Sequence, residues 1–164
     1  MADIQGLDDW LKFLDEAPKK MQQGVHVGLA AGADVIVARA KENCPVGPPN
    51  SENVRLYADY EGALRDSIHA SMTEKNGKVS VTIKAGGKMA SGTDIYYAHL
   101  IEFSGAAPHV IKGKNGNLSF GGRSYASVNH PGMQAKPFLR PALDAGEVAV
   151  IGMIDQEIAA ALLN

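Results

Sequence analysis

The segment 68–85 constrains the fold more than any other, because both of its halves alternate apolar and polar residues around Asn76-Gly77. Few dipeptides other than Asn-Gly readily adopt the two positive φ angles of a tight hairpin turn. A strand points successive side chains to opposite faces, so Val79, Val81 and Ile83 share one apolar face. We therefore predict an antiparallel hairpin whose apolar face is covered by helices and whose hydroxyl-rich face meets water or a lumen.

Two long helices are predicted to supply this cover. The first spans about residues 18–43 and ends before Pro45, because a residue that precedes proline disfavours the helical conformation. A separate short amphipathic helix is expected at residues 7–14, before the proline that opens the long helix. The second long helix spans about residues 139–162, and its apolar stripe is wide enough to contact two partners. The predicted fold class is therefore α+β, with an antiparallel sheet built on the hairpin and both long helices packed on one face.

Three glycines lie four residues apart inside the first long helix, at Gly24, Gly28 and Gly32. Each glycine costs roughly 1 kcal/mol relative to alanine in a helix interior, so together they cost about 3 kcal/mol. Very close packing of another element, within the subunit or across a subunit boundary, would offset this cost. A bend or interruption of the helix is the alternative.

Residues 104–136 form a connection far longer than usual, punctuated by glycine and asparagine. Apolar stretches at 110–111, 118–120 and 125–128 predict a projecting β-ribbon arm that turns at residues 113–117. An isolated two-stranded ribbon is only marginally stable in water, so we expect the arm to gain order from a neighbouring subunit or partner protein.

The segment 130–143 joins the arm to the closing helix. Pro137 and a second proline four residues later suit the start of a helix, where a missing N–H costs nothing. Phe138 and Leu139 are the expected apolar anchor at the base of the arm. Farther upstream, residues 96–103 fit a short helix or a strand, and both alternatives stay open.

Charge is distributed unevenly although the net charge is only −2. Residues 104–140 include five basic residues and no acidic one, whereas residues 1–20 include five acidic residues and residues 141–164 include four. A basic arm between acidic ends suits contact with an acidic surface, either on a neighbouring subunit or on DNA; a solvated loop with a few lysines is the plainer alternative. The low net charge argues against a general nucleic-acid-binding protein.

No constellation of residues indicates an enzyme or a metalloprotein. Cys44 follows the first long helix, where the helix dipole disfavours a thiolate, so a small buried or interfacial thiol is the preferred interpretation. His99, His109 and His130 lack the short paired spacings of a zinc site and are expected to be hydrogen-bonding residues. The segment 86–88 lacks the preceding glycine of a phosphate-binding loop. We therefore predict no catalytic residue, no cofactor and no metal.

Length and composition indicate an ordinary soluble protein. The 164 residues suit one domain over the whole of 1–164, with 45% hydrophobic and 21% charged residues. We expect neither a secretory signal nor a transmembrane helix, because no apolar run is long enough. The single cysteine suits assembly in a reducing cytoplasm.

Five segments carry a family resemblance: Ala40-Lys-Glu-Asn-Cys-Pro-Val46, Ala63-Leu-Arg-Asp-Ser-Ile68, Tyr97-Ala-His-Leu-Ile-Glu-Phe-Ser-Gly105, Pro108-His-Val-Ile111 and Pro137-Phe-Leu-Arg-Pro-Ala-Leu143. In their residues and in their order along the chain, they resemble segments of the neck or tail-completion family of lambdoid long-tailed bacteriophages. Between Gly47 and Glu61 the chain departs from the family pattern, because a longer, polar stretch with two prolines replaces a short turn.

The resemblance implies a structural virion protein that is assembled in the host cytoplasm and located at the neck. There it would form a ring between the head connector and the tail, with six-fold symmetry preferred and twelve-fold symmetry as the second choice. The implied partners are further copies of the chain, the head-completion or connector protein, and tail terminator or tail tube proteins, with non-specific contact to DNA in the lumen as an additional option. A tail terminator or another minor tail component is the alternative, and a nucleic-acid-binding regulator is less favoured.

The residues predicted to contact neighbouring subunits or partners lie in the arm and in the segment that follows it. They are Val110, Ile111, Lys112, Lys114, Leu118, Phe120, Arg123, Tyr125, Lys136, Phe138 and Arg140. Acidic residues near the chain ends, namely Asp8, Asp9, Glu147 and Asp155, offer them complementary charge.

Overall fold

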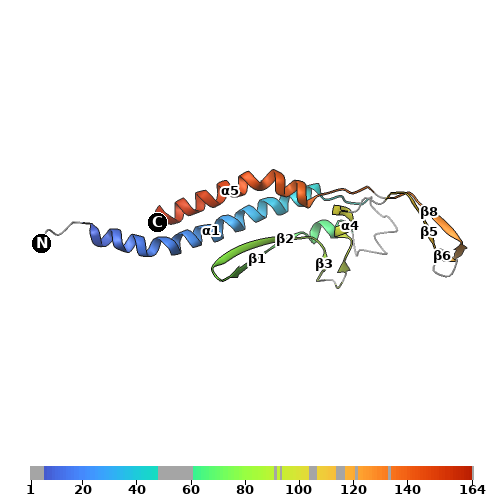
Figure 1. Cartoon of the computed structure of the whole chain (residues 1–164), viewed down its shortest axis with the longest axis horizontal. Coiled ribbons are helices and arrows are strands. Elements are labelled where there is room, and N and C mark those ends of the chain that lie inside the picture. The colour runs from blue at the N-terminus through green and yellow to red at the C-terminus, as the bar shows by residue number, and fades with distance from the viewer. Residues whose placement is uncertain are drawn as a thin grey trace.

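The computed structural model describes residues 6–47, 61–90, 92, 94–103, 107–113, 117–120, 122–132 and 134–163. It is an α+β structure, which confirms the predicted fold class. The molecule is elongated, with two antiparallel helices at one end and a thin β-arm at the other (Figure 1). Lys114 and the polar stretch between Gly47 and Glu61 lie outside the described residues.

Helix α1, Leu7–Asn43, is continuous, so the prediction of two helices separated at Pro18 is wrong. Pro18 lies inside the helix, where its missing N–H removes one i→i−4 hydrogen bond. The apolar positions nevertheless stay in phase on both sides of the proline, because Leu7, Leu14 and Met21 recur at seven-residue spacing. One helix can therefore keep a single apolar stripe across the proline.

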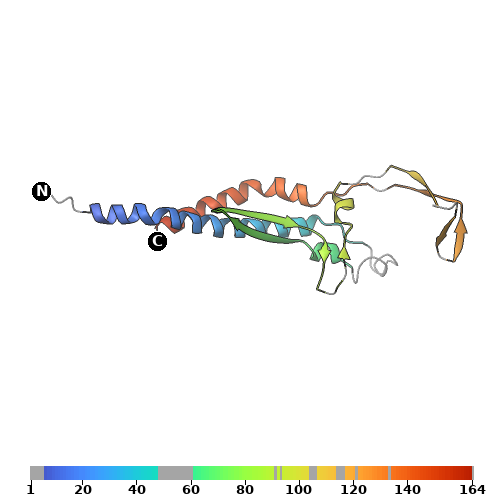
Figure 2. The ribbon, with the colours of Figure 1, turned by 60° about the horizontal axis from the view of Figure 1, so that its bottom comes forward.

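Helix α5, Leu139–Leu163, runs antiparallel to α1 and packs along it. The first turns of α1 project beyond the end of α5, so the N-terminal end of α1 stands alone at one pole of the molecule (Figures 1 and 2). No helix in the described part of the chain is both long and apolar enough to cross a membrane.

Strands β1, His69–Lys75, and β2, Lys78–Lys84, form the predicted antiparallel hairpin, which is therefore confirmed. His69 lies opposite Lys84, and Lys75 lies opposite Lys78. The turn has the predicted pair of positive φ angles, 54° at Asn76 and 72° at the following glycine.

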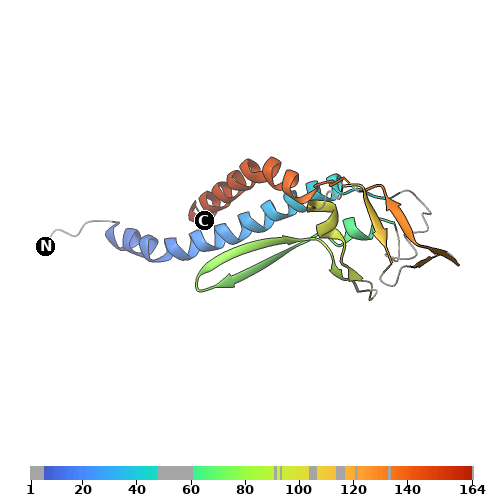
Figure 3. The ribbon, with the colours of Figure 1, turned by 45° about the vertical axis from the view of Figure 1, so that its right-hand side comes forward.

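The hairpin packs against α1, and α5 lies on another side of the same helix (Figure 3). This layering differs from the predicted one, in which both helices covered the hairpin. The reason is that α1 presents two faces: its glycines meet α5, whereas Gln22 and His26 meet the hairpin. The Glu74 carboxylate accepts a hydrogen bond of 3.0 Å from Gln22 and lies 3.4 Å from His26 Nε2, which fixes the end of the hairpin on the helix.

The core lies where the end of α1 meets the short elements of the middle of the chain. These elements are α3 (Ala63–Asp66), the paired strands β3 (Gly87–Lys88) and β4 (Asp94–Ile95), and α4 (Ala98–Phe103). Segment 96–103 is thus helical from Ala98 onward. The buried cluster consists of Ile36, Ala40, Cys44, Ala63, Leu64, Ile68, Ile95, Ala98, Phe138 and Ala142.

The arm is a nested β-ribbon. Strand β5 (His109–Lys112) pairs with β8 (Ser127–His130), and β6 (Leu118–Phe120) pairs with β7 (Arg123–Tyr125). The ribbon reverses between β6 and β7 rather than around residues 113–117 as predicted, and residues 114–116 of that predicted turn lie outside the described residues. Only two residues separate these strands, and Gly122 supplies a φ of 72°, which a tight reversal needs.

Candidate assembly interface

The glycines of α1 lie at the crossing with α5. A Cβ atom on Gly24 would lie 2.7 Å from the Cα of Ile158, and one on Gly28 would lie 2.5 Å from the Cα of Ile154. These distances are shorter than any real Cβ contact, so only glycine allows the two backbones to approach this closely. The helix does not break at these positions, and the offset for the glycine cost comes from packing within the subunit.

The base of the arm is held to the helical body by Glu102. Its carboxylate accepts hydrogen bonds from the backbone N–H groups of Phe138 (2.8 Å), Leu139 (3.0 Å) and Arg140 (2.9 Å). These groups lie at the start of α5, Phe138 just before its first residue, where the N–H donors otherwise would have no partner within the helix. Glu102 is only 5% exposed, so it closes the helix end from inside the protein. Glu102 therefore caps the N-terminus of α5.

Burial raises the pKa of Glu102, but the hydrogen bonds from Leu139, Phe138 and Arg140 and the charge of Arg140 outweigh it. The pKa of this carboxyl therefore lies below its ordinary value. Glu102 is ionised in the folded protein at neutral pH, and its negative charge faces the positive end of the α5 dipole.

Other contacts around Glu102 fix the direction in which the arm leaves the body. The Lys136 N–H donates to the Ile101 carbonyl (2.9 Å), and the Arg140 guanidinium lies 5.8 Å from the centre of the Phe103 ring. Phe138 is fully buried. Of the residues predicted to contact partners, Phe138 thus lies in the core of its own subunit, and Lys136 and Arg140 lie at the base of the arm.

The remaining predicted contact residues lie along the ribbon. Val110 is 53% exposed and Ile111 is 37% exposed, so both apolar side chains face solvent in the single subunit. Lys112 lies opposite Ser127. In the distal hairpin, Leu118 lies opposite Tyr125 and Phe120 lies opposite Arg123. The ribbon is therefore a narrow surface that combines exposed apolar and basic side chains.

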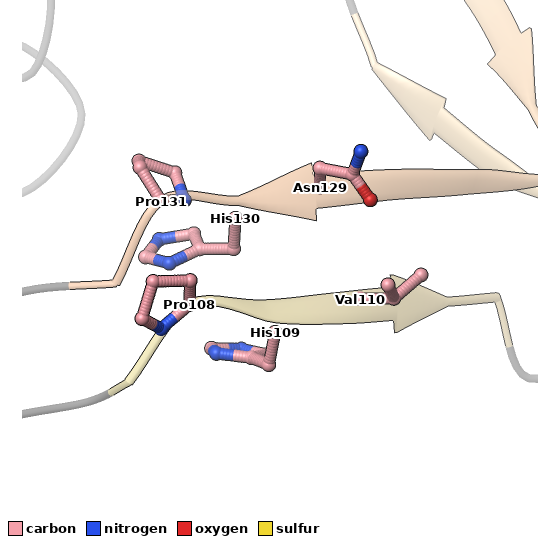
Figure 4. A pocket seen from close by; sticks show the side chains of 6 residues that line it. All are labelled: Pro108, His109, Val110, Asn129, His130 and Pro131. Atoms are coloured by element: carbon pink, nitrogen blue, oxygen red, sulfur yellow. The ribbon is translucent and has the colours of Figure 1, made fainter.

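A histidine pair lies where the ribbon begins. His109 and His130 are register partners, and their stacked rings have centroids 5.0 Å apart (Figure 4). His109 Nδ1 lies 2.9 Å from the Ala107 carbonyl oxygen, and the Gly132 N–H donates to His130 Nδ1 (3.1 Å). A cavity of about 410 Å³ beside the pair is lined by Pro108, His109, Val110, Asn129, His130 and Pro131.

These contacts match the expectation that the histidines are hydrogen-bonding residues. His99 behaves in the same way, with Nδ1 2.9 Å from the Tyr96 carbonyl oxygen. The pairing of His109 with His130 was not predicted, because the turn had been placed elsewhere and the register could not be assigned. Within the described residues, no group of three or more His, Cys, Asp or Glu side chains is arranged to hold a metal ion.

Cys44 lies in the core and is 5% exposed. Burial raises the pKa of its thiol to about 11, with Arg65 lowering it and Asp66 raising it further. The thiol is therefore protonated at neutral pH and is a poor nucleophile. It packs as a small apolar side chain, in agreement with the buried-thiol interpretation.

Sequence reasoning missed Ser67, which ties the base of the hairpin to its surroundings. This buried hydroxyl donates to the Leu64 carbonyl (2.6 Å) and accepts from the Gly86 N–H (2.8 Å). A serine just before an alternating strand is the only sequence signal for it, and that signal is weak.

Comparison with known proteins identifies the family. A model of the HK97-gp10-like family, described as "Bacteriophage HK97-gp10, putative tail-component", matches residues 8–103. The match covers more than half of the chain and includes α1, the hairpin and α4 with Glu102. No curated protein and no solved structure matches significantly. On the strength of the family match, the chain belongs to the HK97-gp10-like family of bacteriophage tail components.

Proposed function

We propose that this chain is a structural protein of the phage neck and that its copies form a ring joining the DNA-filled head connector to the tail. The arm is the observation that carries this proposal. It projects from the helical body while exposing Val110 and Ile111, which a protein acting as a single subunit would have no reason to expose. The membership in a family of phage tail components supports the structural, non-catalytic role.

The arm is built to reach a neighbour in a fixed direction. Glu102 and Phe138 anchor its base, so its direction follows from the rigid helical body. Both long edges of the β5–β8 ribbon have unpaired backbone groups among the described strands, which suits strand addition by a neighbouring chain. Glu147 and Asp155, both exposed on α5, offer acidic partners for the basic arm.

A ring follows from such a head-to-tail contact when the rotation per subunit divides a full circle. We favour six copies, which would match a tail tube, with twelve as the second choice. The neighbours would be the head-completion or connector protein on one side and the tail terminator or tail tube on the other, and the lumen would contact DNA without sequence preference. The mature location would be the neck of the virion, after assembly in the host cytoplasm.

The decisive experiment removes residues 115–123 from the arm and complements a phage that lacks the wild-type protein. We expect a folded subunit that cannot complete particles, so that DNA-filled heads and tails accumulate separately. Negative-stain microscopy of the purified wild-type protein shows whether rings form and how many copies they contain. Normal infectivity of the deletion would refute the assembly role of the arm.

A charge-reversal pair gives a matched control. Lys112→Glu with Arg123→Glu inverts the charge of the arm, and Lys75→Glu with Lys78→Glu makes the same change at the tip of the other exposed hairpin. Only the arm pair is expected to block joining. A tail terminator would instead cause tails of irregular length, and a nucleic-acid-binding regulator would retain DNA in filter binding at low and at moderate salt.

A further inference from the structure

We propose that the outward surface of the β1–β2 hairpin binds the phosphate backbone of double-stranded DNA without sequence preference. Four pairs of register partners form this surface, which we call the outer face: His69 with Lys84, Ser71 with Thr82, Thr73 with Ser80, and Lys75 with Lys78. Basic pairs thus lie at both ends of the outer face, and hydroxyl pairs lie between them. The surface would meet DNA in the lumen of the proposed ring, and only this location rests on the proposed function.

The opposite, inner face of the hairpin packs within the subunit. Because side chains alternate along a strand, the residues between the four pairs all lie on this inner face. Ile83 packs there against the buried cluster, and Glu74 contacts Gln22 and His26 of α1. The outer face therefore points away from α1, and no described element lies beyond the hairpin on that side (Figure 3).

The outer face is exposed and carries no acidic residue. Seven of its eight side chains are exposed, and Ser71 is half-buried. Its basic side chains include three lysines, whereas the whole chain has a net charge of −2. Positive charge is therefore concentrated on this face, and an anionic partner would complement it.

Two of these lysines repel each other. Lys75 and Lys78 lie directly opposite each other beside the turn, and like charges in this position destabilise a pair of strands. Glu74 precedes Lys75 in the sequence but lies on the inner face, where Gln22 and His26 contact its carboxylate. An anion bound from outside would offset the repulsion between the two lysines.

The residue types of the outer face favour phosphate groups as this anion. Phosphate oxygens accept hydrogen bonds from lysine and from serine and threonine hydroxyls, and such contacts carry no sequence information. A protein partner would favour aromatic or other apolar side chains at the centre of the contact, and the outer face has neither. A single strand of nucleic acid would need aromatic side chains on which its bases stack. Duplex DNA needs neither feature, because its bases are already stacked and its phosphates face outward.

The length of the outer face suits contact with several phosphates. Lys78 and Lys84 lie six residues apart on β2, which corresponds to about 20 Å. A duplex that runs along the face presents about twelve phosphates over this length, counted on both strands. Each of the three lysines can therefore contact a phosphate of its own.

The outer face and the arm have different tasks in the proposed ring. The basic arm is matched there to the acidic residues Glu147 and Asp155 of a neighbouring copy, which leaves the outer face for DNA. Joining of heads to tails then depends on the arm, and DNA contact depends on the hairpin. The pair Lys75→Glu with Lys78→Glu should accordingly weaken DNA binding although it should not block joining.

The experiment measures binding of the purified full chain to a fluorescent duplex of mixed sequence. Fluorescence anisotropy follows a duplex of about 20 base pairs between about 50 and 200 mM salt. Three lysine contacts per subunit predict a slope of about −2.7 for the logarithm of the association constant against the logarithm of the salt concentration, which is an affinity loss of about 40-fold over this range. Duplexes of different sequence should bind equally, and a single strand of the same length should bind more weakly. Sedimentation velocity determines the association state, so that the slope can be stated per subunit.

Variants locate the contact. Lys78→Gln with Lys84→Gln removes two of the three lysine contacts, so the slope should fall to about −0.9 and the affinity loss to about fourfold. Lys12→Gln with Lys19→Gln makes the same change of charge at two exposed positions of α1 and should leave the slope unchanged. Circular dichroism melts establish that each variant is folded.

Three outcomes would overturn the proposal. The first is a wild-type chain that does not bind the duplex at about 50 mM salt. The second is a slope that falls in Lys112→Gln with Arg123→Gln but not in the hairpin pair, which would place DNA on the arm. The third is tighter binding of poly-glutamate than of the duplex, which would make the outer face a site for an acidic protein. Rings seen by microscopy beside any of these results would leave the proposed function standing, whereas the expected slope without rings would refute only the ring.

Discussion

Replacing Glu102 with alanine tests whether one buried carboxylate holds the arm segment and α5 to the body. The change leaves the N–H groups of Phe138, Leu139 and Arg140, at the start of α5, without their acceptor. Phe138 is fully buried, so water cannot easily reach its N–H, and an unsatisfied buried donor costs about 1–3 kcal/mol. Leu139 and Arg140 are better exposed, so the loss of the cap there costs about 0.5–1 kcal/mol each.

The expected loss for Glu102→Ala is therefore about 2–5 kcal/mol of unfolding free energy, which corresponds to a drop in Tm of about 4–20 °C for a chain of this size. Urea unfolding at neutral pH, followed by circular dichroism, measures it. Glu147→Ala is the matched control, because it removes an exposed carboxylate from the same helix and should change the stability by less than about 0.5 kcal/mol. A loss of similar size in both variants would show that the Glu102 cap contributes no more to the unfolding free energy than an exposed carboxylate does.

The pH dependence gives a second, independent check. The pKa of Glu102 is lowered in the folded protein, so its contribution is present above the ordinary value of 4.5 and is lost as pH falls through the folded pKa. The stability difference between the wild type and Glu102→Gln, an uncharged isostere, should therefore shrink as the pH is lowered from about 6 to 3. A difference that stays constant over this range would contradict a role for the negative charge.

Three further predictions concern the glycines and the thiol. Gly28→Leu should destabilise the protein by at least about 1–3 kcal/mol, because its Cβ would lie 2.5 Å from the Ile154 backbone. As the control, Gly152→Ala should stabilise the protein by up to about 1 kcal/mol, because the added Cβ meets nothing within 4 Å. Thermal melts compare the two variants. Gly77→Val should lower the unfolding free energy by about 1–2 kcal/mol by placing a β-branched residue at a φ of 72°, and an unchanged Tm would count against the turn. Cys44 should resist thiol reagents until the chain unfolds, and rapid labelling of the folded protein at pH 8 would contradict this. Because burial raises the pKa of its thiol to about 11, its contribution to stability should be lost as pH rises from 9 toward 11.

The elements that could be predicted from sequence are those whose information is local. The hairpin depends on alternation within seven-residue strands and on one Asn-Gly turn, and its register follows from these alone. The predicted break at Pro18 also followed from a local rule, but in the structure the helix continues through the proline. A proline costs about 3 kcal/mol in a helix interior, and a single apolar stripe on both sides of it favours one continuous helix.

Distant contacts could be predicted by type but not by partner. The glycine spacing in α1 required a close neighbour, yet nothing near Gly28 in the sequence indicates that this neighbour is Ile154. Glu102 caps α5, but its N–H donors lie 36 to 38 positions later in the chain. Such pairings depend on where the chain returns after the arm, and the periodicity of a single segment does not contain that information.

The exposed residues of the arm and the residues that anchor its base differ in burial. Phe138 and Glu102 act within the subunit, since one is fully buried and the other binds the first turn of α5. Val110 and Ile111 lie on a ribbon without a core of its own, and both are exposed in the single subunit. In the proposed assembly, a neighbouring chain would cover them. In the sequence, the apolar and basic residues of the arm cannot be told apart from those that anchor its base. What separates them is the carboxylate of Glu102, which fixes the start of α5 and so determines where the body ends and the arm begins.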